Sequence, residues 1–304
     1  MDKKYSAQIK LSIAALVFFI AAFIAGTFCD RAAAEALFSP DITLAKLITT
    51  LGVYPFYAAQ VFFWGALFQR GLSSDKSRPV RASMCAVCVL WTVFIGYIGS
   101  RSMTSANNLG SIYPSVTGNL PVIIILSAVL MYPLFFAGYN AAGKSEDKLL
   151  AKRILGLFSV LLAAYISMEL LKNSFDRPRY RTAVLGYEDI TFVPWYRPFA
   201  GAEELAAKYG IGADEFRSFP SGHSIFSMLS MCILPSLTWL FPKLRDKHIA
   251  LFFCGLAFGI VIMVTRMILG AHYLSDTSAG AVIGVLSSIA FSAIQLHISK
   301  KQPT

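Results

Sequence analysis

Long apolar stretches separated by short polar segments dominate this sequence. Eight stretches reach or approach the roughly 20 apolar residues that a helix needs to cross a hydrocarbon core about 30 Å thick. Because lipid offers no hydrogen-bond partner to the backbone, each stretch is predicted to be helical. The expected spans are residues 11–28, 47–69, 82–100, 120–142, 154–171, 224–240, 249–269 and 277–298. The pattern therefore predicts an all-α, polytopic transmembrane helix bundle of about eight spans.

The composition agrees with a membrane protein. Hydrophobic residues make up 56% of the 304 residues and charged residues only 14%, whereas charged residues supply about a quarter of an ordinary soluble domain. The net charge of +10 is interpreted against a bilayer, so no nucleic-acid partner is expected. The five cysteines are interpreted as structural, because even the Cys85-x-x-Cys88 pair lies in an uncharged run.

The positions of Lys and Arg predict the orientation, because short loops rich in these residues stay on the cytoplasmic side. Positive charge is concentrated before the first expected span and after the second, fourth, sixth and eighth. Both termini are therefore expected in the cytoplasm. The segment 172–223 is long and polar and is expected outside, with a short helix near residues 201–210. The first apolar stretch is interpreted as a retained anchor and not a signal peptide, because its apolar core is long and no clear cleavage site follows.

Ionisable residues gather at the outer ends of four expected spans. A charge at the centre of a bilayer costs roughly 2.5–3.5 kcal/mol on insertion scales, so such residues need an explanation. They are Lys172, His223, Arg266, His272 and Asp276. Because these ends lie on one side of the predicted bundle, the side chains are expected to converge.

Such a cluster is suited to a tetrahedral anion. Lysine and arginine match phosphate oxygens, and Gly222 would let backbone amides approach an anion. Asp276 follows His272 by four residues, so its carboxylate is expected to accept a hydrogen bond from the imidazole and to make the other ring nitrogen more nucleophilic. His223 is then available as a proton donor. Glu169 is expected to orient Lys172 through an ion pair.

Three motifs give the chain its resemblance to the type 2 phosphatidic acid phosphatase family, whose active-site pattern is shared with vanadium-dependent haloperoxidases. The family's first motif, Lys, six residues and Arg-Pro, corresponds to Lys172 and Arg179, with Tyr180 in place of the proline. The second, Pro-Ser-Gly-His, stands intact at residues 220–223. The third, Ser-Arg, five residues, His, three residues and Asp, corresponds to Thr265, Arg266, His272 and Asp276, with threonine replacing serine.

The resemblance implies a role for each matched residue. His272 would form a phosphohistidine, Asp276 would orient it, and His223 would protonate the leaving group. The phosphoryl oxygens would be held by Lys172, Arg179, Ser221, Gly222 and Arg266. Arg177 is either a further phosphate contact or a side chain that reaches the lipid headgroups. No metal and no cofactor are implied, and the sequence has no acidic cluster suited to magnesium.

The resemblance covers about residues 154–298 and implies two regions. Residues 1–150 would be N-terminal transmembrane helices, two of them additional to the family's usual six, and residues 151–304 would be the catalytic helices with the extracytoplasmic loop 172–223. The expected localisation is a bacterial inner membrane, with the site facing the extracytoplasmic side.

The expected substrate is a lipid phosphate whose tail stays in the bilayer. Undecaprenyl diphosphate and glycerophospholipid phosphates, namely phosphatidic acid and phosphatidylglycerol phosphate, are favoured among family substrates, which also include lipid A phosphates. Two alternatives stay open: a lipid-to-lipid phosphotransferase that uses the same site, and a transporter, which would place its charges at mid-membrane and show an internal repeat.

Overall fold

The computed structural model describes residues 2–300, and all regular secondary structure in this range is helical. The helices before the long loop are α1 (Asp2–Leu37), α2 (Thr43–Thr50), α3 (Tyr54–Leu72), α4 (Arg78–Met103), α5 (Leu120–Leu126), α6 (Tyr132–Gly143) and α7 (Leu150–Lys172). The later ones are α8 (Tyr180–Ala183), α9 (Ala202–Tyr209), α10 (Gly222–Met228), α11 (Ser230–Ser236), α12 (His248–Ile268) and α13 (Leu274–Lys300). A π-helical turn, Ser127–Met131, joins α5 to α6. Single 3-10 turns occupy Leu109–Ser111, Pro114–Val116, Ala213–Phe216, Leu237–Trp239 and Pro242–Lys247.

The predicted fold class is confirmed: the protein is an all-helical membrane protein. Seven helical segments within residues 2–300 are long and apolar enough to cross a bilayer. They are Lys3–Leu37, Thr43–Leu72, Arg78–Met103, Leu120–Gly143, Leu150–Lys172, Pro242–Ile268 and Leu274–Lys300. Six of them contain an expected span in full, and Pro242–Ile268 contains all but the last residue of the expected span 249–269.

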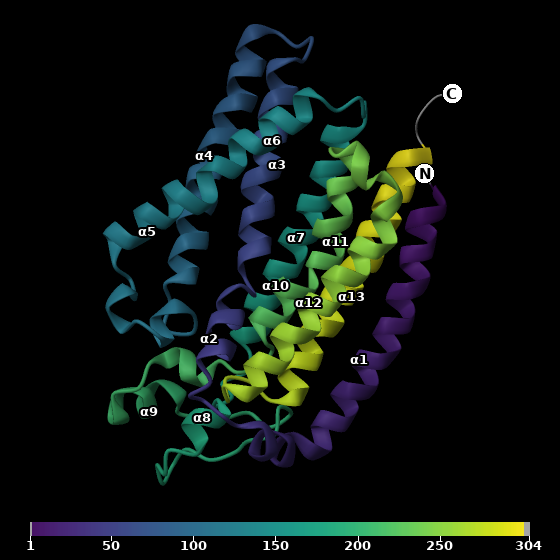
Figure 1. Ribbon diagram of the computed structural model, residues 1–304. Helices are drawn as coiled ribbons and strands as arrows, with labels where there is room; N and C mark the ends of the chain where they lie inside the picture. The colour runs from purple at the N-terminus through teal and green to yellow at the C-terminus, as the bar shows by residue number, and fades with distance from the viewer. Residues whose placement is uncertain (1, 301–304) are drawn as a thin grey trace.

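The sixth expected span, residues 224–240, is not one long helix. It is divided into α10, α11 and a 3-10 turn, with Leu229 between the two α-helices and Pro235 inside the second. Proline has no backbone N–H and so cannot continue the hydrogen-bond ladder. The two short helices still follow one another through the middle of the bundle (Figure 1). This interrupted segment is not among the seven candidate spans, and the start of α1 and the end of α13 lie at the same end of the bundle.

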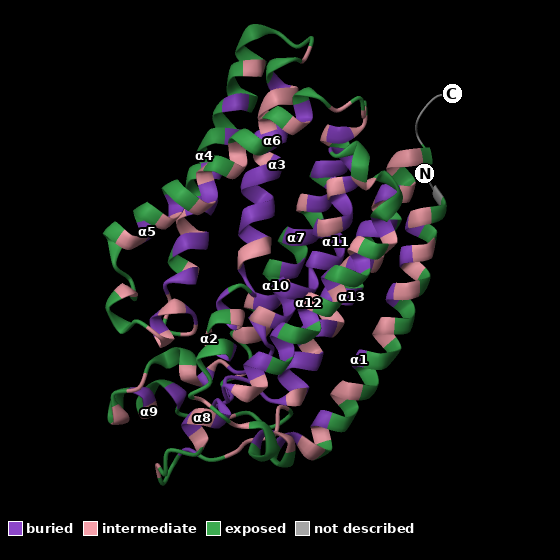
Figure 2. Ribbon diagram, in the orientation of Figure 1, coloured by how far each residue is buried: buried purple, intermediate pink, exposed green. Residues whose placement is uncertain are grey.

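Two groups of helices make up the bundle. Helix α1 packs along α13, and α10 and α11 pack against α12 and α13. Helices α3, α4 and α6 form a second group beside them (Figure 1). Figure 2 shows that α10 and α11 are mostly buried, whereas α4 and α5 expose much of their surface. The site therefore forms around buried central helices.

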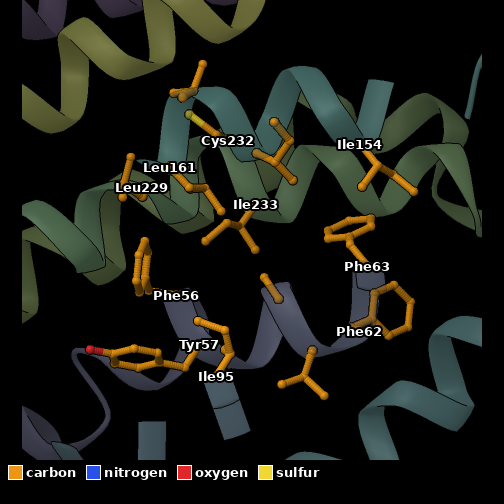
Figure 3. Close-up of a cluster of buried hydrophobic side chains, with 14 of the residues drawn as sticks. Phe56, Tyr57, Phe62, Phe63, Ile95, Ile154, Leu161, Leu229, Cys232 and Ile233 are labelled. Atoms are coloured by element: carbon orange, nitrogen blue, oxygen red, sulfur yellow. The ribbon is translucent and has the colours of Figure 1, made fainter. Parts of the chain in front are cut away.

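A buried hydrophobic cluster joins the two groups (Figure 3). Phe56 and Phe63 of α3 face Leu161 of α7 and Ile233 of α11. Within the second group, α3 and α6 approach through glycines: a Cβ at Gly138 would lie 1.8 Å from the Phe62 carbonyl oxygen. Small residues let membrane helices approach in this way.

The loop between α7 and α10 lies at the end of the bundle opposite the termini, together with α8 and α9 (Figure 1). The short helix expected near residues 201–210 is confirmed as α9, and Gly210 follows it with a φ of +65°. Glycine takes this left-handed conformation without steric cost, so it ends the helix. Helix α1 continues to Leu37, nine residues beyond the expected span, so Asp30 is helical and not part of an external loop.

Candidate active site

His272 lies in the short turn between α12 and α13 and is buried, with 1% of its surface exposed. Its Nδ1 lies 2.7 Å from the backbone carbonyl oxygen of Ser218. Because a carbonyl oxygen only accepts, Nδ1 carries the proton and Nε2 carries the lone pair. Burial lowers the pKa of His272 to about 3. The imidazole is therefore neutral at physiological pH and presents Nε2 as its basic atom.

Asp276 does not accept a direct hydrogen bond from His272, contrary to the sequence-based expectation. Its Oδ2 lies 3.8 Å from His272 Nδ1, because His272 precedes α13 and does not share a helical turn with Asp276. The Asp276 carboxylate instead accepts hydrogen bonds from the Ser218 hydroxyl at 2.5 Å and from the Tyr273 backbone N–H at 2.8 Å. Ser218 thus contacts both His272 and Asp276 and fixes their relative position.

His223 occupies the first turn of α10. Its Nε2 lies 2.9 Å from Oδ1 of Asn108, which follows α4. The Asn108 amide nitrogen donates to Ser102 and Ser105, so its oxygen is the acceptor toward His223. In the neutral histidine, Nε2 therefore carries the proton and Nδ1 the lone pair.

Lys172 ends α7, and its ammonium group donates to the backbone carbonyl of Arg217 at 3.0 Å. A Cβ at Gly222 would lie 3.4 Å from Lys172 Cε, so the lysine passes beside the first residue of α10. The expected ion pair with Glu169 is not formed, because the Glu169 carboxylate pairs with the Arg217 side chain at 3.4 Å. Lys172 is thus positioned by a loop carbonyl.

Arg179 is 2% exposed and is held by the loop that precedes α10. Its Nε and Nη2 donate to Asp214, at 2.9 Å to the carbonyl and 2.7 Å to the carboxylate, and its Nη1 donates to the Ala271 carbonyl at 3.2 Å. Burial would raise the pKa of Asp214, but Arg179 and Lys172 hold it below its ordinary value. Arg179 therefore carries its own counterion.

Arg266 differs from Arg179 because two of its nitrogen atoms have no hydrogen-bond partner among the described residues. It is 1% exposed and its Nη1 donates to the Asn107 carbonyl at 3.1 Å, but among the described residues its Nε and Nη2 have no hydrogen-bond partner. Buried guanidinium groups are ordinarily fully hydrogen-bonded. Two free donors on a buried arginine are suited to an anionic ligand.

Ser221 and Gly222 shape the start of α10. The Ser221 hydroxyl accepts the backbone N–H of Ser224, and the Ser221 N–H donates to the Asp276 carbonyl at 3.0 Å. A Cβ at Gly280 would lie 2.7 Å from the Ser221 carbonyl oxygen, so α13 passes very close to this point. These contacts bring the second and third motifs together.

Arg177 takes neither of the roles considered from the sequence. It is 2% exposed, so it does not reach the headgroups, and its guanidinium donates to Asp276 at 2.5 Å and to Asp30 at 2.8 Å. Its Nε donates to the Val193 carbonyl. All three of its nitrogen atoms therefore contact the protein, which leaves it a positioning role.

The predicted residues do come together. Electrostatic interactions link His223 to Arg266, His272, Arg179 and Lys172, so both histidines and three cations share one region. The region lies at the end of the bundle where α7 and α12 finish and α10 and α13 begin. Among residues 2–300, no three His, Cys, Asp or Glu side chains are grouped so that they could hold a metal ion.

Sequence reasoning missed four residues that contact this cluster: Asp30, Asn107, Asn108 and Ser218. None belongs to a recognisable motif. For Asp30 the usable signal is an acidic residue only two positions beyond the expected span 11–28. The asparagine pair reaches the site only through the folding of the segment after α4.

Comparison with known proteins agrees with this geometry. Residues 153–299 match the PAP2 superfamily. The lipid A 1-phosphatase of Rhizobium johnstonii is 26% identical over 235 residues, which cover 75% of this chain and 86% of that protein. The lipid A 1-phosphatase of Rhizobium etli is 26% identical over 213 residues, covering 68% and 82%. No solved structure matches the chain.

The family match begins at the start of α7 and ends in α13, so it contains all three motifs and every sequence-predicted site residue. Helices α1 to α6 precede it. Through residues 153–299, the chain belongs to the PAP2 superfamily.

Proposed function

We propose that this protein hydrolyses a lipid phosphate through a phosphohistidine on His272, without a metal ion. The observation that carries the proposal is the hydrogen bond from His272 Nδ1 to the Ser218 carbonyl, which leaves the lone pair on Nε2 of a ring that neighbours Arg179 and Arg266. A neutral imidazole with a fixed tautomer is a competent nucleophile. Cations around the phosphoryl group stabilise the charge on its oxygens in the transition state.

In the first step, His272 Nε2 attacks phosphorus, a nitrogen–phosphorus bond forms, and the bond from phosphorus to the lipid oxygen breaks. The bound phosphate dianion favours the protonated form of His223, which gives its Nδ1 proton to that departing oxygen while its Nε2–H stays on Asn108. In the second step, His223 takes a proton from water, the water oxygen attacks phosphorus, and the nitrogen–phosphorus bond breaks. Inorganic phosphate leaves and both histidines return to their starting states.

Each cation has a distinct part in this scheme. Arg266 offers Nε and Nη2 to two phosphoryl oxygens, since neither atom has a partner among the described residues. Lys172 would exchange its carbonyl contact for a phosphoryl oxygen. Arg179 keeps its ion pair with Asp214 and contributes its positive charge without a direct bond to the phosphoryl group. Ser221 and Gly222 keep the start of α10 close to the cluster.

For the substrate we propose a lipid whose phosphate lies at the membrane surface, with a 1-phosphorylated lipid A as the first candidate. The support is the 26% identity to two lipid A 1-phosphatases over most of both chains. Undecaprenyl diphosphate, phosphatidic acid and phosphatidylglycerol phosphate are the competing substrates. We also propose that the site faces the extracytoplasmic side. The positive-inside rule supports this orientation, because the lysine-rich loops lie toward the end of the bundle where α1 begins and α13 ends.

The test is phosphate release from these four lipids by the purified protein in detergent containing EDTA. We expect release by the wild type, fastest from lipid A 1-phosphate, and loss of about a thousandfold or more in His272→Ala, since removal of a nucleophile costs at least that much in other enzymes. His297→Ala is the matched control, because that exposed histidine lies near the far end of α13.

Three results would contradict parts of the proposal. Activity that survives His272→Ala would rule out the phosphohistidine, and activity abolished by EDTA would rule out metal independence. Transfer of the phosphoryl group to a second lipid, with no free phosphate, would make the protein a phosphotransferase.

A further inference from the structure

A buried carboxylate from the N-terminal helix lies next to the beginning of α13. Helix α1 approaches closely here, because a Cβ at Gly26 would lie 2.6 Å from the Ser275 backbone nitrogen. One turn further along α1, the Asp30 carboxylate accepts the Ser275 N–H at 2.8 Å and the Ser275 hydroxyl at 2.5 Å. Asp30 is only 3% exposed. It lies well before residue 153, where the family match starts.

Arg177 connects this carboxylate to Asp276. Its Nη2 lies 2.8 Å from Asp30 Oδ2 and its Nη1 lies 2.5 Å from Asp276 Oδ1. The guanidinium stacks over the Tyr273 ring, 3.9 Å from the ring centroid. One arginine is thus fixed between two carboxylates, one from α1 and one from α13.

The charges in this chain of contacts leave a net negative charge. Asp30 and Asp276 carry two negative charges and Arg177 one positive charge, so the sum is −1 with Asp30 and zero without it. The other oxygen of Asp276 is held by Ser218, whose carbonyl binds His272. As His272 attacks phosphorus its ring gains positive charge, which a net negative neighbour stabilises.

We propose that Asp30 is a positioning residue of the active site: through Arg177 it fixes the Asp276 carboxylate and maintains the negative charge behind His272. This inference rests on the proposed function. Helix α1 would then be a working part of the phosphatase and not only a membrane anchor. The Asp30 carboxylate acts through Arg177, so it should affect the rate of phosphoryl transfer and not the binding of the lipid.

The test compares kcat and KM of Asp30→Asn with those of the wild type, using the best lipid found above. We expect kcat to fall about ten- to hundredfold, the range known for residues that orient metal ligands through a hydrogen bond, with KM changed by less than about threefold. Asp30→Glu, which keeps the charge, should recover part of the lost kcat. Glu35→Gln is the control, because Glu35 lies on the same helix in an exposed pair with Arg31.

Asp30→Asn leaves Arg177 with one carboxylate fewer and could impair folding. The double variant Asp30→Asn with Arg177→Gln removes both charges of that pair, leaves the sum at −1 and should elute as a monodisperse protein. Its kcat should still be reduced, because the Asp276 carboxylate loses the Arg177 contact that fixes it. A kcat within twofold of wild type in Asp30→Asn or in the double variant would overturn the inference, as would a change confined to KM or a failure of both variants to fold. A wild type that releases no phosphate, or that is indifferent to His272→Ala, would instead overturn the proposed function.

Discussion

At the scale of single residues, burial sets the protonation of the proposed nucleophile. His272 is 1% exposed and neighbours Arg179 and Arg266, so its charged form is disfavoured. The Ser218 carbonyl then fixes which nitrogen keeps the proton. A neutral imidazole is what phosphoryl transfer needs, but it makes the folded state sensitive to acid.

This sensitivity predicts a loss of stability as the pH falls. Burial lowers the pKa of His272 from 6.5 to about 3, so below pH 6.5 the unfolded chain takes up a proton that the folded chain rejects. The free energy of unfolding should therefore decrease from pH 6.5 downward until the pH reaches the folded-state pKa. In His272→Asn this contribution is absent, so its thermal unfolding midpoint in detergent should fall less between about pH 7 and pH 5.

His297→Asn, which alters an exposed histidine of α13, should follow the wild-type pH dependence. Equal slopes for the wild type and His272→Asn would contradict the buried, neutral state of His272.

At the scale of elements, the segment between α4 and α5 completes the site from outside the family match. Asn107 bonds to Arg266 through its backbone carbonyl and to Asp214 through its side chain, and Asn108 bonds to His223. One short segment therefore contacts residues from the loop, α10 and α12. A substitution of Asn108 tests whether this segment takes part in proton transfer.

Asn108→Leu should impair the protonation of the leaving group. Without the Asn108 oxygen, the Nε2–H of His223 loses its acceptor, so the ring is no longer held with Nδ1 toward the substrate. We expect kcat for the lipid to fall about a hundredfold, the lower part of the range for general acid catalysis. Hydrolysis of p-nitrophenyl phosphate, whose leaving group needs no proton, should fall much less.

Asn119→Ser is the control, because Asn119 lies in the same segment but its side chain caps α5 and donates to the Ser115 carbonyl. An equal loss for both substrates would show that Asn108 acts on structure and not on proton transfer.

The close packing of α3 against α6 leads us to predict how a larger residue at their contact affects stability. In Gly138→Ala the new methyl group would meet the Phe62 carbonyl at 1.8 Å, so the two helices must separate. Overpacking of this kind costs typically about 1–3 kcal/mol, and the thermal unfolding midpoint should drop accordingly. Gly143→Ala in the same helix is the control, because its new methyl group would come no closer than 3.8 Å to its nearest neighbour, the Gln69 amide nitrogen. Equal midpoints for the two variants would contradict the packing.

At the scale of the whole molecule, hydropathy and motif spacing predicted the class of fold and the residues that meet. A long apolar run must be helical in lipid, because its backbone has to satisfy its own hydrogen bonds. The motif residues lie at helix ends that are on the same side of the predicted bundle, so they were expected to meet. The interruption near Leu229 was not predicted, because the run 224–240 has no charged residue and only Pro235 marks a break. Asp30, Asn108 and Ser218 were missed because their partners are distant in sequence and depend on how helices pack.

The positions of Lys and Arg predict a topology in which residues 2 and 300 face the cytoplasm. Alkaline phosphatase, which folds only outside the cytoplasm, should be active when inserted at Gly186 of the long loop, which has open space around it. It should be inactive when fused after residue 300 or inserted near Ser74, between α3 and α4. Activity at the second or third position would contradict the proposed orientation.

The central claim is that His272 becomes phosphorylated during turnover. The most direct measurement is mass spectrometry of the protein quenched in alkali after mixing with lipid A 1-phosphate and EDTA, because phosphohistidine survives base and is lost in acid. The account predicts a phosphoryl group on the peptide that contains His272, and none in His272→Ala. A phosphoryl group on another residue, or phosphate release with no phosphorylated peptide and undiminished turnover in His272→Ala, would contradict it.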